Sequence, residues 1–147
     1  MPDPYAGLLK KSPYYMKSDL AARVVAVLDT KLDNRGLSLI TQASRAIPAG
    51  QIHELVATEE ESAAPGKTVN QAVYMAFVEF LTGGVVLSGD SVLLGEKEIG
   101  KLAGFDETHF PNHLNIIVKC PRAFTGRELQ LRPGDVIRFK FNPSAET

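Results

Sequence analysis

The chain has 147 residues, of which 44% are hydrophobic and 22% are charged, so its composition predicts one globular domain and excludes an intrinsically disordered chain. Its 16 Lys and Arg side chains and 17 Asp and Glu side chains leave a net charge near −1, which argues against nucleic acid or an acidic membrane as a partner. The single cysteine, Cys120, excludes an intramolecular disulfide.

The apolar runs of the sequence are too short for membrane insertion. The longest, residues 72–78, covers far less than the roughly 20 residues that a spanning helix needs, and the first residues lack the apolar core of a secretory signal. We therefore expect a reduced, cytoplasmic protein with no membrane partner. A net charge close to zero gives little repulsion between copies, so the sequence is compatible with a homodimer.

Residues 1–17 contain three prolines and three tyrosines and follow neither helical periodicity nor strand alternation. We predict an irregular arm over residues 1–17, a β-barrel domain over residues 18–142 and a short tail over residues 143–147. One alternative gives the arm, through Tyr14 and Tyr15, a role in contact with another protein.

Residues 20–32 are rich in β-branched side chains and are followed by the turn-forming sequence DNRG. This pattern predicts a strand, a turn and a second strand over the sequence LSLIT. A short helix over residues 19–28 is the competing interpretation, because the apolar spacing there fits both structures. After a bend at Gly50 a further strand is expected, on which His53 and Glu54 point to opposite faces.

The second half of the chain is punctuated like a small β-fold. A solvated loop over residues 58–68 precedes an alternating run over residues 69–81, which we interpret as a strand although a helix also fits. From residue 83 onward, glycines separate short apolar runs, and further strands are expected over residues 113–120 and 132–141. The sequence therefore predicts a mainly β protein, a single small antiparallel barrel or sandwich of about seven to nine short strands.

One stretch of the chain concentrates polar side chains. The sequence FDETHFPNHLN, residues 105–115, holds two of the three histidines together with two acids and two asparagines. Pro111 disfavours a helix here, so the two histidines cannot form the helical face of a zinc protease. The stretch must instead be a loop that enters a strand, with His113 and Asn115 on one face.

Two chemical uses of this stretch involve catalysis or a metal. A divalent metal ion could be held by His53, Glu107, His109 and His113. Imidazole and carboxylate ligands together suit zinc, iron, nickel or manganese. Alternatively, His109 or His113 could act as a general base beside Asp106 or Glu107, with the carboxylate holding the tautomer of the ring.

Two further uses involve binding or group transfer. A polar or anionic small molecule could be hydrogen-bonded at a barrel mouth by His53, Glu54, Asn112 and Asn115. Arg45 could clamp an anionic group of the same molecule. A histidine could also carry a phosphoryl group as a covalent intermediate. Against all of these stands a structural interpretation, in which the polar side chains only cap and turn the loop.

Cys120 ends an apolar run before a proline. We expect it to be a buried small hydrophobe rather than a nucleophile.

Two segments resemble known families. The sequence GGVVLSGDSVLLGEKEIGKLAGFD, residues 83–106, resembles the glycine-turn pattern of the second-domain barrel of translation elongation factors, which implies a barrel. Residues 89–139, with GDSVLLG, FPNHLNI and PGDVIRF, are similar to the sorbitol-specific phosphotransferase IIA component, a β protein in which a histidine carries phosphate. The chain as a whole resembles an uncharacterised bacterial family of small β-barrel domains, which implies no activity.

The interpretation we favour is a β-barrel that binds a small polar or anionic molecule at a mouth formed by residues 105–115. A small enzyme that uses a histidine with Asp106 or Glu107, with or without a metal ion, is the alternative from another class. A protein-interaction subunit is the third.

Overall fold

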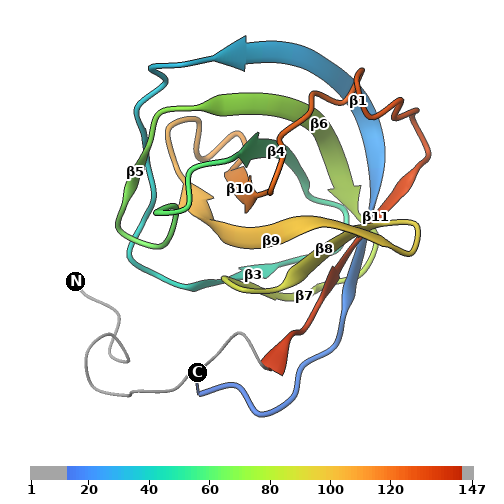
Figure 1. The fold of residues 1–147 in the computed structure, drawn as a ribbon. Coiled ribbons are helices and arrows are strands. Elements are labelled where there is room, and N and C mark those ends of the chain that lie inside the picture. Colours follow the sequence, from blue (N-terminus) through green and yellow to red (C-terminus); the bar gives the residue numbers. More distant parts are fainter. Residues whose placement is uncertain (1–12, 144–147) are drawn as a thin grey trace.

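Strands with alternating burial close into a barrel in the computed structural model, which describes residues 13–143 (Figure 1). Among these residues, seven strands form the barrel in the order β1-β11-β8-β9-β10-β4-β6, and the other four form two-stranded sheets, β2 with β5 and β3 with β7. The strands are β1 (Leu20–Leu32), β2 (Leu37–Ser38), β3 (Ser44–Ile47), β4 (Ile52–Thr58), β5 (Thr68–Val69), β6 (Ala72–Phe80), β7 (Gly84–Leu87), β8 (Ser91–Leu94), β9 (Lys97–Asp106), β10 (Asn115–Lys119) and β11 (Val136–Lys140).

Neighbouring strands of the barrel are antiparallel except β10 and β4, which pair in parallel. Strand β1 pairs with β11 near its start and with β6 along most of its length. The β1–β6 register is interrupted between Val24 and Ala26 and again between Val27 and Thr30. Such irregularities increase twist and bend a strand, which lets β1 curve far enough to close the barrel.

Inward-facing side chains fill the barrel. Phe80, Phe105 and Phe139 are fully buried, and the rings of Phe80 and Phe139 stack with their centroids 5.4 Å apart. Leu114 and Ile116 belong to the same interior cluster. Burying one large apolar side chain contributes roughly 1.5–3 kcal/mol to stability, so this cluster is the main source of favourable folding energy.

A second apolar cluster lies outside the barrel, over β4 and β10. Val56 of β4 and Ile117 of β10 pack with Leu37 of β2 and Val69 of β5. Because alternate residues of a strand face opposite sides, the sequence neighbours of Val56 and Ile117 point into the barrel instead. The small β2–β5 sheet therefore covers the outer face of the barrel at this place.

The predicted fold class is confirmed, since the described residues are mainly β and include a closed barrel of short strands. Residues 20–32 and 72–80 are strands, so the helices that competed for these segments are wrong. The parallel pair was not expected, because the alternation of a half-buried strand is the same whichever way its neighbour runs.

Part of the predicted arm and tail, residues 1–12 and 144–147, lies outside the described residues. Within residues 13–143, no helix is long and apolar enough to cross a membrane.

A buried ion pair fastens the segment before β1 to the barrel. The Nζ atom of Lys17 lies 2.8 Å from Oδ2 of Asp90, and the two side chains are only 7% and 1% exposed. The same carboxylate oxygen accepts the Leu87 N–H at 2.9 Å. Burial raises the pKa of Asp90, and the hydrogen bond from Lys17 opposes this rise. The carboxylate therefore depends on Lys17 to compensate for its lost hydration.

Replacing Lys17 with Met should lower the free energy of unfolding by about 2–3 kcal/mol, because the Asp90 carboxylate would stay buried without its counter-charge. Urea unfolding of Lys17→Met measures this loss, with Lys67→Met as a control at an exposed lysine. Equal unfolding free energies for the two variants would contradict a stabilising role for the ion pair.

Candidate functional site

The strand register separates two ends of the barrel. Parallel pairing sets Asn115 of β10 beside Glu54 of β4, and Asn115 also lies opposite Asp106 of β9. Lys119, at the other end of β10, lies beside Thr58 at the end of β4. The polar loop predicted as the site therefore lies at the Asp106 end, away from the first residues of β9.

Asp106 has a structural role in this arrangement. It is 1% exposed and accepts hydrogen bonds from the N–H groups of Ser38 and Thr108, at 2.9 Å each, and from the side-chain amide of Asn115 at 3.1 Å. These bonds join β2, the loop after β9 and β10. The catalytic role predicted for Asp106 gains no support, because its carboxylate is engaged by groups of the protein itself.

His53 lies inside the barrel, with its ring centroid 6.0 Å from that of Phe80. Its Nδ1 accepts the Leu114 N–H at 2.9 Å, so Nε2 carries the proton and donates to Oε1 of Gln51 at 2.9 Å. Burial, together with the nearby charge of Arg45, lowers the pKa of His53 to about 4. His53 is therefore neutral near pH 7, and both of its ring nitrogens are engaged within the chain.

His113 faces Glu54 rather than either of the acids predicted as its partner. Its Nε2 is buried without a hydrogen-bond partner 3.7 Å from Oε1 of Glu54, and its Nδ1 lies 2.7 Å from Oδ1 of Asn112. The rings of His109 and Phe77 each lie 5.0 Å from its own, stacked and edge-on respectively. Burial lowers the pKa of His113 and raises the pKa of Glu54. Both shifts favour the uncharged forms of the two groups.

The other charged residues of the predicted site pair with each other. Oε2 of Glu107 accepts a hydrogen bond from Nη1 of Arg45 at 2.6 Å, and the Arg45 guanidinium lies 4.8 Å from the centre of the Phe110 ring. Within residues 13–143, no three His, Cys, Asp or Glu side chains are arranged to hold a metal ion. The structure does not assemble the predicted metal ligands into a site, because Glu107 turns to Arg45 and His53 turns into the barrel. The other two predicted ligands are the stacked pair His109 and His113.

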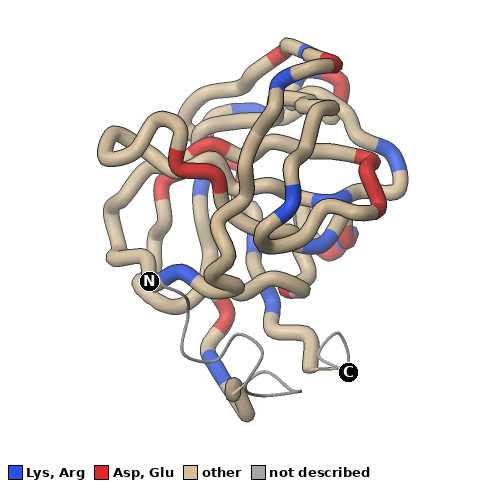
Figure 2. Tube along the Cα trace, turned by 90° about the vertical axis from the view of Figure 1, so that its left-hand side faces the viewer, with Lys and Arg blue, Asp and Glu red and all other residues tan. Residues whose placement is uncertain are grey.

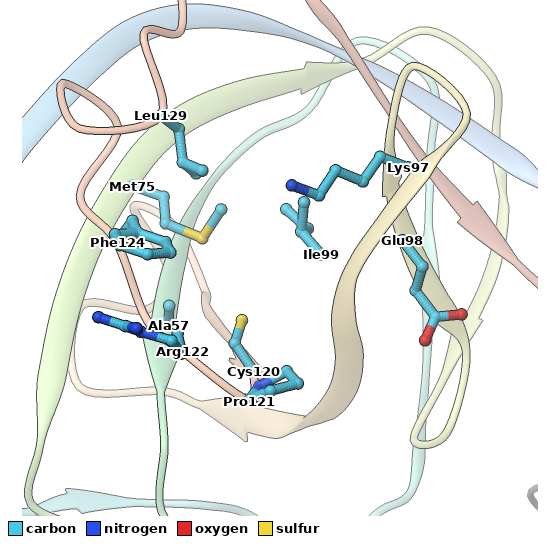
Figure 3. A pocket seen from close by; sticks show the side chains of 10 residues that line it. All are labelled: Ala57, Met75, Lys97, Glu98, Ile99, Cys120, Pro121, Arg122, Phe124 and Leu129. Atoms are coloured by element: carbon cyan, nitrogen blue, oxygen red, sulfur yellow. The ribbon is translucent and has the colours of Figure 1, made fainter.

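A cavity of about 190 Å³ opens at the opposite end of the barrel (Figure 3). Its inner wall is apolar, since Ala57, Met75 and Cys120 are buried and Ile99 is partly buried. Burial raises the pKa of the Cys120 thiol to about 11, so the thiol is protonated near pH 7 and belongs to the apolar wall, as expected from the sequence. The remaining lining residues are Lys97, Glu98, Pro121, Arg122, Phe124 and Leu129.

A single turn over residues 125–130, called here the capped turn, covers one side of the cavity. The Thr125 hydroxyl accepts the Glu128 N–H at 3.1 Å, and Oε1 of Glu128 accepts the Thr125 N–H at 2.9 Å, which is the reciprocal bonding of a capping box. The Thr125 hydroxyl also donates to Asp29 of β1 at 3.0 Å. Phe124 and Leu129 are thereby held at the cavity wall.

Gly126 allows the capped turn to approach β1 and β6. Its N–H donates to the carbonyl of Tyr74 at 3.3 Å, and the N–H of Arg127 donates to the carbonyl of Leu28 at 3.2 Å. These bonds lie in the interrupted part of the β1–β6 register. A Cβ atom at Gly126 would collide with the carbonyl oxygen of Met75, so only glycine fits this position.

The sequence indicates a site at residues 105–115 and does not indicate this cavity. Two signals for it were present. The alternation of Lys97, Glu98 and Ile99 puts the first and third side chains on one face of a strand, and Thr125 with Glu128 has the spacing of a capping box. Neither signal reveals a cavity, because its volume depends on residues that come together only in the folded chain.

Comparison with known families places the chain in one of them. Residues 14–140 match a family described as "Family of unknown function (DUF6917)". The chain belongs to this family. No curated protein and no solved structure matches it. Membership of an uncharacterised family of small β-barrel domains is thereby confirmed, whereas a bacterial origin and the resemblances to the elongation-factor barrel and the sorbitol phosphotransferase component stay predictions.

Replacing Gly126 with Ala should lower the free energy of unfolding by at least about 2 kcal/mol, because the added methyl group must displace β6 or the capped turn. Gly83→Ala is the matched control, since an added Cβ there meets no atom closer than 3.4 Å. Urea unfolding of both variants gives the comparison. A loss at Gly126 no larger than that at Gly83 would show that the close approach is not needed.

Buried, neutral His53 should make stability depend on pH. The unfolded chain binds a proton at this histidine near pH 6.5, whereas the folded chain binds it only near pH 4. The contribution of His53 is therefore complete above pH 6.5 and is lost as the pH falls towards 4, by an amount on the order of 2–3 kcal/mol.

Urea unfolding of the wild type and His53→Gln across this pH range tests the expectation. Glu54 and Asp90, whose pKa values are raised, act in the opposite direction in both proteins, so the difference between the two proteins isolates His53. The variant should lose less stability on acidification. Identical pH profiles of the two proteins would show that folding does not lower the pKa of His53.

Proposed function

We propose that this protein binds a small, largely apolar molecule in the cavity at the Cys120 end of the barrel. The cavity itself carries the proposal. Its volume of about 190 Å³ exceeds the roughly 150 Å³ of an apolar cavity that takes up benzene. An apolar wall with a few charged groups at the rim is typical of small-molecule sites. A ligand built around one ring or a short branched chain fits this space.

The proposal keeps the binding function expected from the sequence but moves its place away from residues 105–115. At that loop, Asp106 and His53 accept hydrogen bonds from main-chain N–H groups, and Glu107 is paired with Arg45. Their polar atoms are thus largely used in holding the fold. The ten residues that line the cavity are free of histidine and mostly apolar, which favours binding over acid–base chemistry there.

The acid–base alternative now rests on His113 and Glu54. Nε2 of His113 lies 3.7 Å from Oε1 of Glu54 and is buried without a hydrogen-bond partner. An unpartnered ring nitrogen beside a carboxylate is a feature of proton-transfer sites, so this alternative stays a prediction, with Glu54 in place of Asp106 or Glu107.

We further propose that the protein works in the cytoplasm and has no nucleic-acid partner. The 16 basic and 17 acidic residues nearly balance, and both kinds of position occur along the tube in Figure 2, which argues against a polyanion as a partner. The free, buried Cys120 suits a reducing compartment. A homodimer and a bacterial source stay predictions.

Toluene and benzyl alcohol should bind saturably and raise the melting temperature of the protein. Leu129→Trp, which fills the cavity from the capped turn, should weaken binding at least about tenfold, whereas Leu81→Trp, at an exposed leucine after β6, should leave it unchanged. Ligand-observed NMR and thermal unfolding give both readouts. Ala57→Leu fills the cavity from β4 and serves as a second variant if Leu129→Trp lowers stability.

This proposal is contradicted if no ring-sized molecule, neutral or anionic, binds saturably. It is also contradicted if both cavity-filling variants fold and bind as tightly as the wild type.

A further inference from the structure

We propose that the ligand of this cavity carries one negative charge and that the Lys97 ammonium group binds it, so that the protein selects small monocarboxylates with an apolar body. This inference rests on the proposed function, since it names the class of molecule that the same cavity accepts.

Strand geometry directs Lys97 towards the cavity. Lys97 lies directly opposite Leu94 of β8, and residues directly opposite each other on paired strands point to the same face of the sheet. Leu94 and Ile99 both pack against the interior cluster of the barrel. Figure 3 shows the Lys97 side chain extending into the space beside Ile99, while the carboxylate of Glu98 points away from it. Lys97 is itself exposed, so it stands at the rim of the cavity, on the side of β9 that faces the opening.

The other charged groups around the opening have partners within the protein. Oε2 of Glu98 accepts a hydrogen bond from Nζ of Lys101 at 3.1 Å. The carboxylate of Glu59, which lies close enough to raise the pKa of the nearby thiol, accepts a main-chain N–H at 2.8 Å. The Arg122 guanidinium lies 5.7 Å from the centre of the Phe124 ring. None of these groups neutralises the charge of Lys97.

Lys97 is a cation of the opening that has no partner among the described residues. Within the described part of the chain its side chain has no ion pair, hydrogen bond or ring contact. A lysine at the edge of an apolar surface lays its methylene stem along that surface and keeps its ammonium group in water. A carboxylate at one end of a bound apolar molecule would meet the ammonium group there.

The ammonium group of Lys97, unpaired among residues 13–143, also indicates the charge of the ligand. Hydrogen bonds between ionised partners are roughly twice as strong as neutral ones, so a carboxylate gains more from Lys97 than a neutral polar group does. One ammonium group matches one negative charge. A doubly charged phosphate would need a second cation beside Lys97. Arg122 also lines the opening, with its guanidinium 5.7 Å from the centre of the Phe124 ring, so its contribution is tested separately below.

Benzoate and benzamide test this inference because they have nearly the same shape and differ in charge. Isothermal titration at low salt should show that the wild type binds benzoate at least about tenfold more tightly than benzamide. Lys97→Met should abolish this preference and leave benzamide binding unchanged. Lys67→Met, at an exposed lysine just before β5, is the matched control and should keep the preference. Arg122→Gln removes the other cation that lines the opening and is compared with Lys97→Met.

Three results would overturn the inference in distinguishable ways. Equal affinity of the wild type for benzoate and benzamide would remove the charge assignment and leave the proposed function standing. Equal losses of benzoate affinity in Lys97→Met and Arg122→Gln would indicate a general field at the opening and not a bond to Lys97. Absence of binding by these two compounds, toluene and benzyl alcohol alike would defeat the proposed function and the inference with it.

Discussion

The parallel pairing of β4 with β10 is the contact on which this barrel depends. It joins a strand from the first half of the chain to the antiparallel strands of the second half, and so completes the closed sheet. It also fixes direction. With Asn115 beside Glu54 and Lys119 beside Thr58, the residues that begin β4 and β10 share one end of the barrel, and the residues that follow these strands share the other.

The two ends use their side chains differently. At the polar end, His53 accepts the buried N–H of Leu114, which would cost about 1–3 kcal/mol if it had no partner. Asp106 accepts the N–H groups of Ser38 and Thr108 beside it. Among the described residues, a few buried side-chain nitrogen and oxygen atoms have no hydrogen-bond partner. Nε2 of His113 and Oδ1 of Asn115 are two of them, and both lie at this end. At the cavity end the wall is apolar, and unused space rather than an unused polar atom is the distinguishing feature.

The sequence predicts those parts of the structure that depend on local pattern. Alternation and β-branched side chains over residues 20–32 indicate the first strand, and the same alternation places His53 and Glu54 on opposite faces. Which face enters the core depends on the neighbouring strands, and these come from distant parts of the chain. The burial of Cys120 can be predicted because it follows from the apolar residues next to it in the sequence. The cavity beside Cys120 cannot be predicted in this way, because its walls come from distant parts of the chain.

In and beside the capped turn, the groups that stabilise the fold differ from the side chains that line the cavity. Gly126 and the paired bonds of Thr125 and Glu128 set the path of the backbone, whereas the side chains of Phe124 and Leu129 form part of the cavity wall. Replacing Phe124 or Leu129 with another residue alters the shape of the cavity without changing a residue of any barrel strand. The shape of the cavity can therefore change through residues outside the barrel strands, while the barrel itself stays constant.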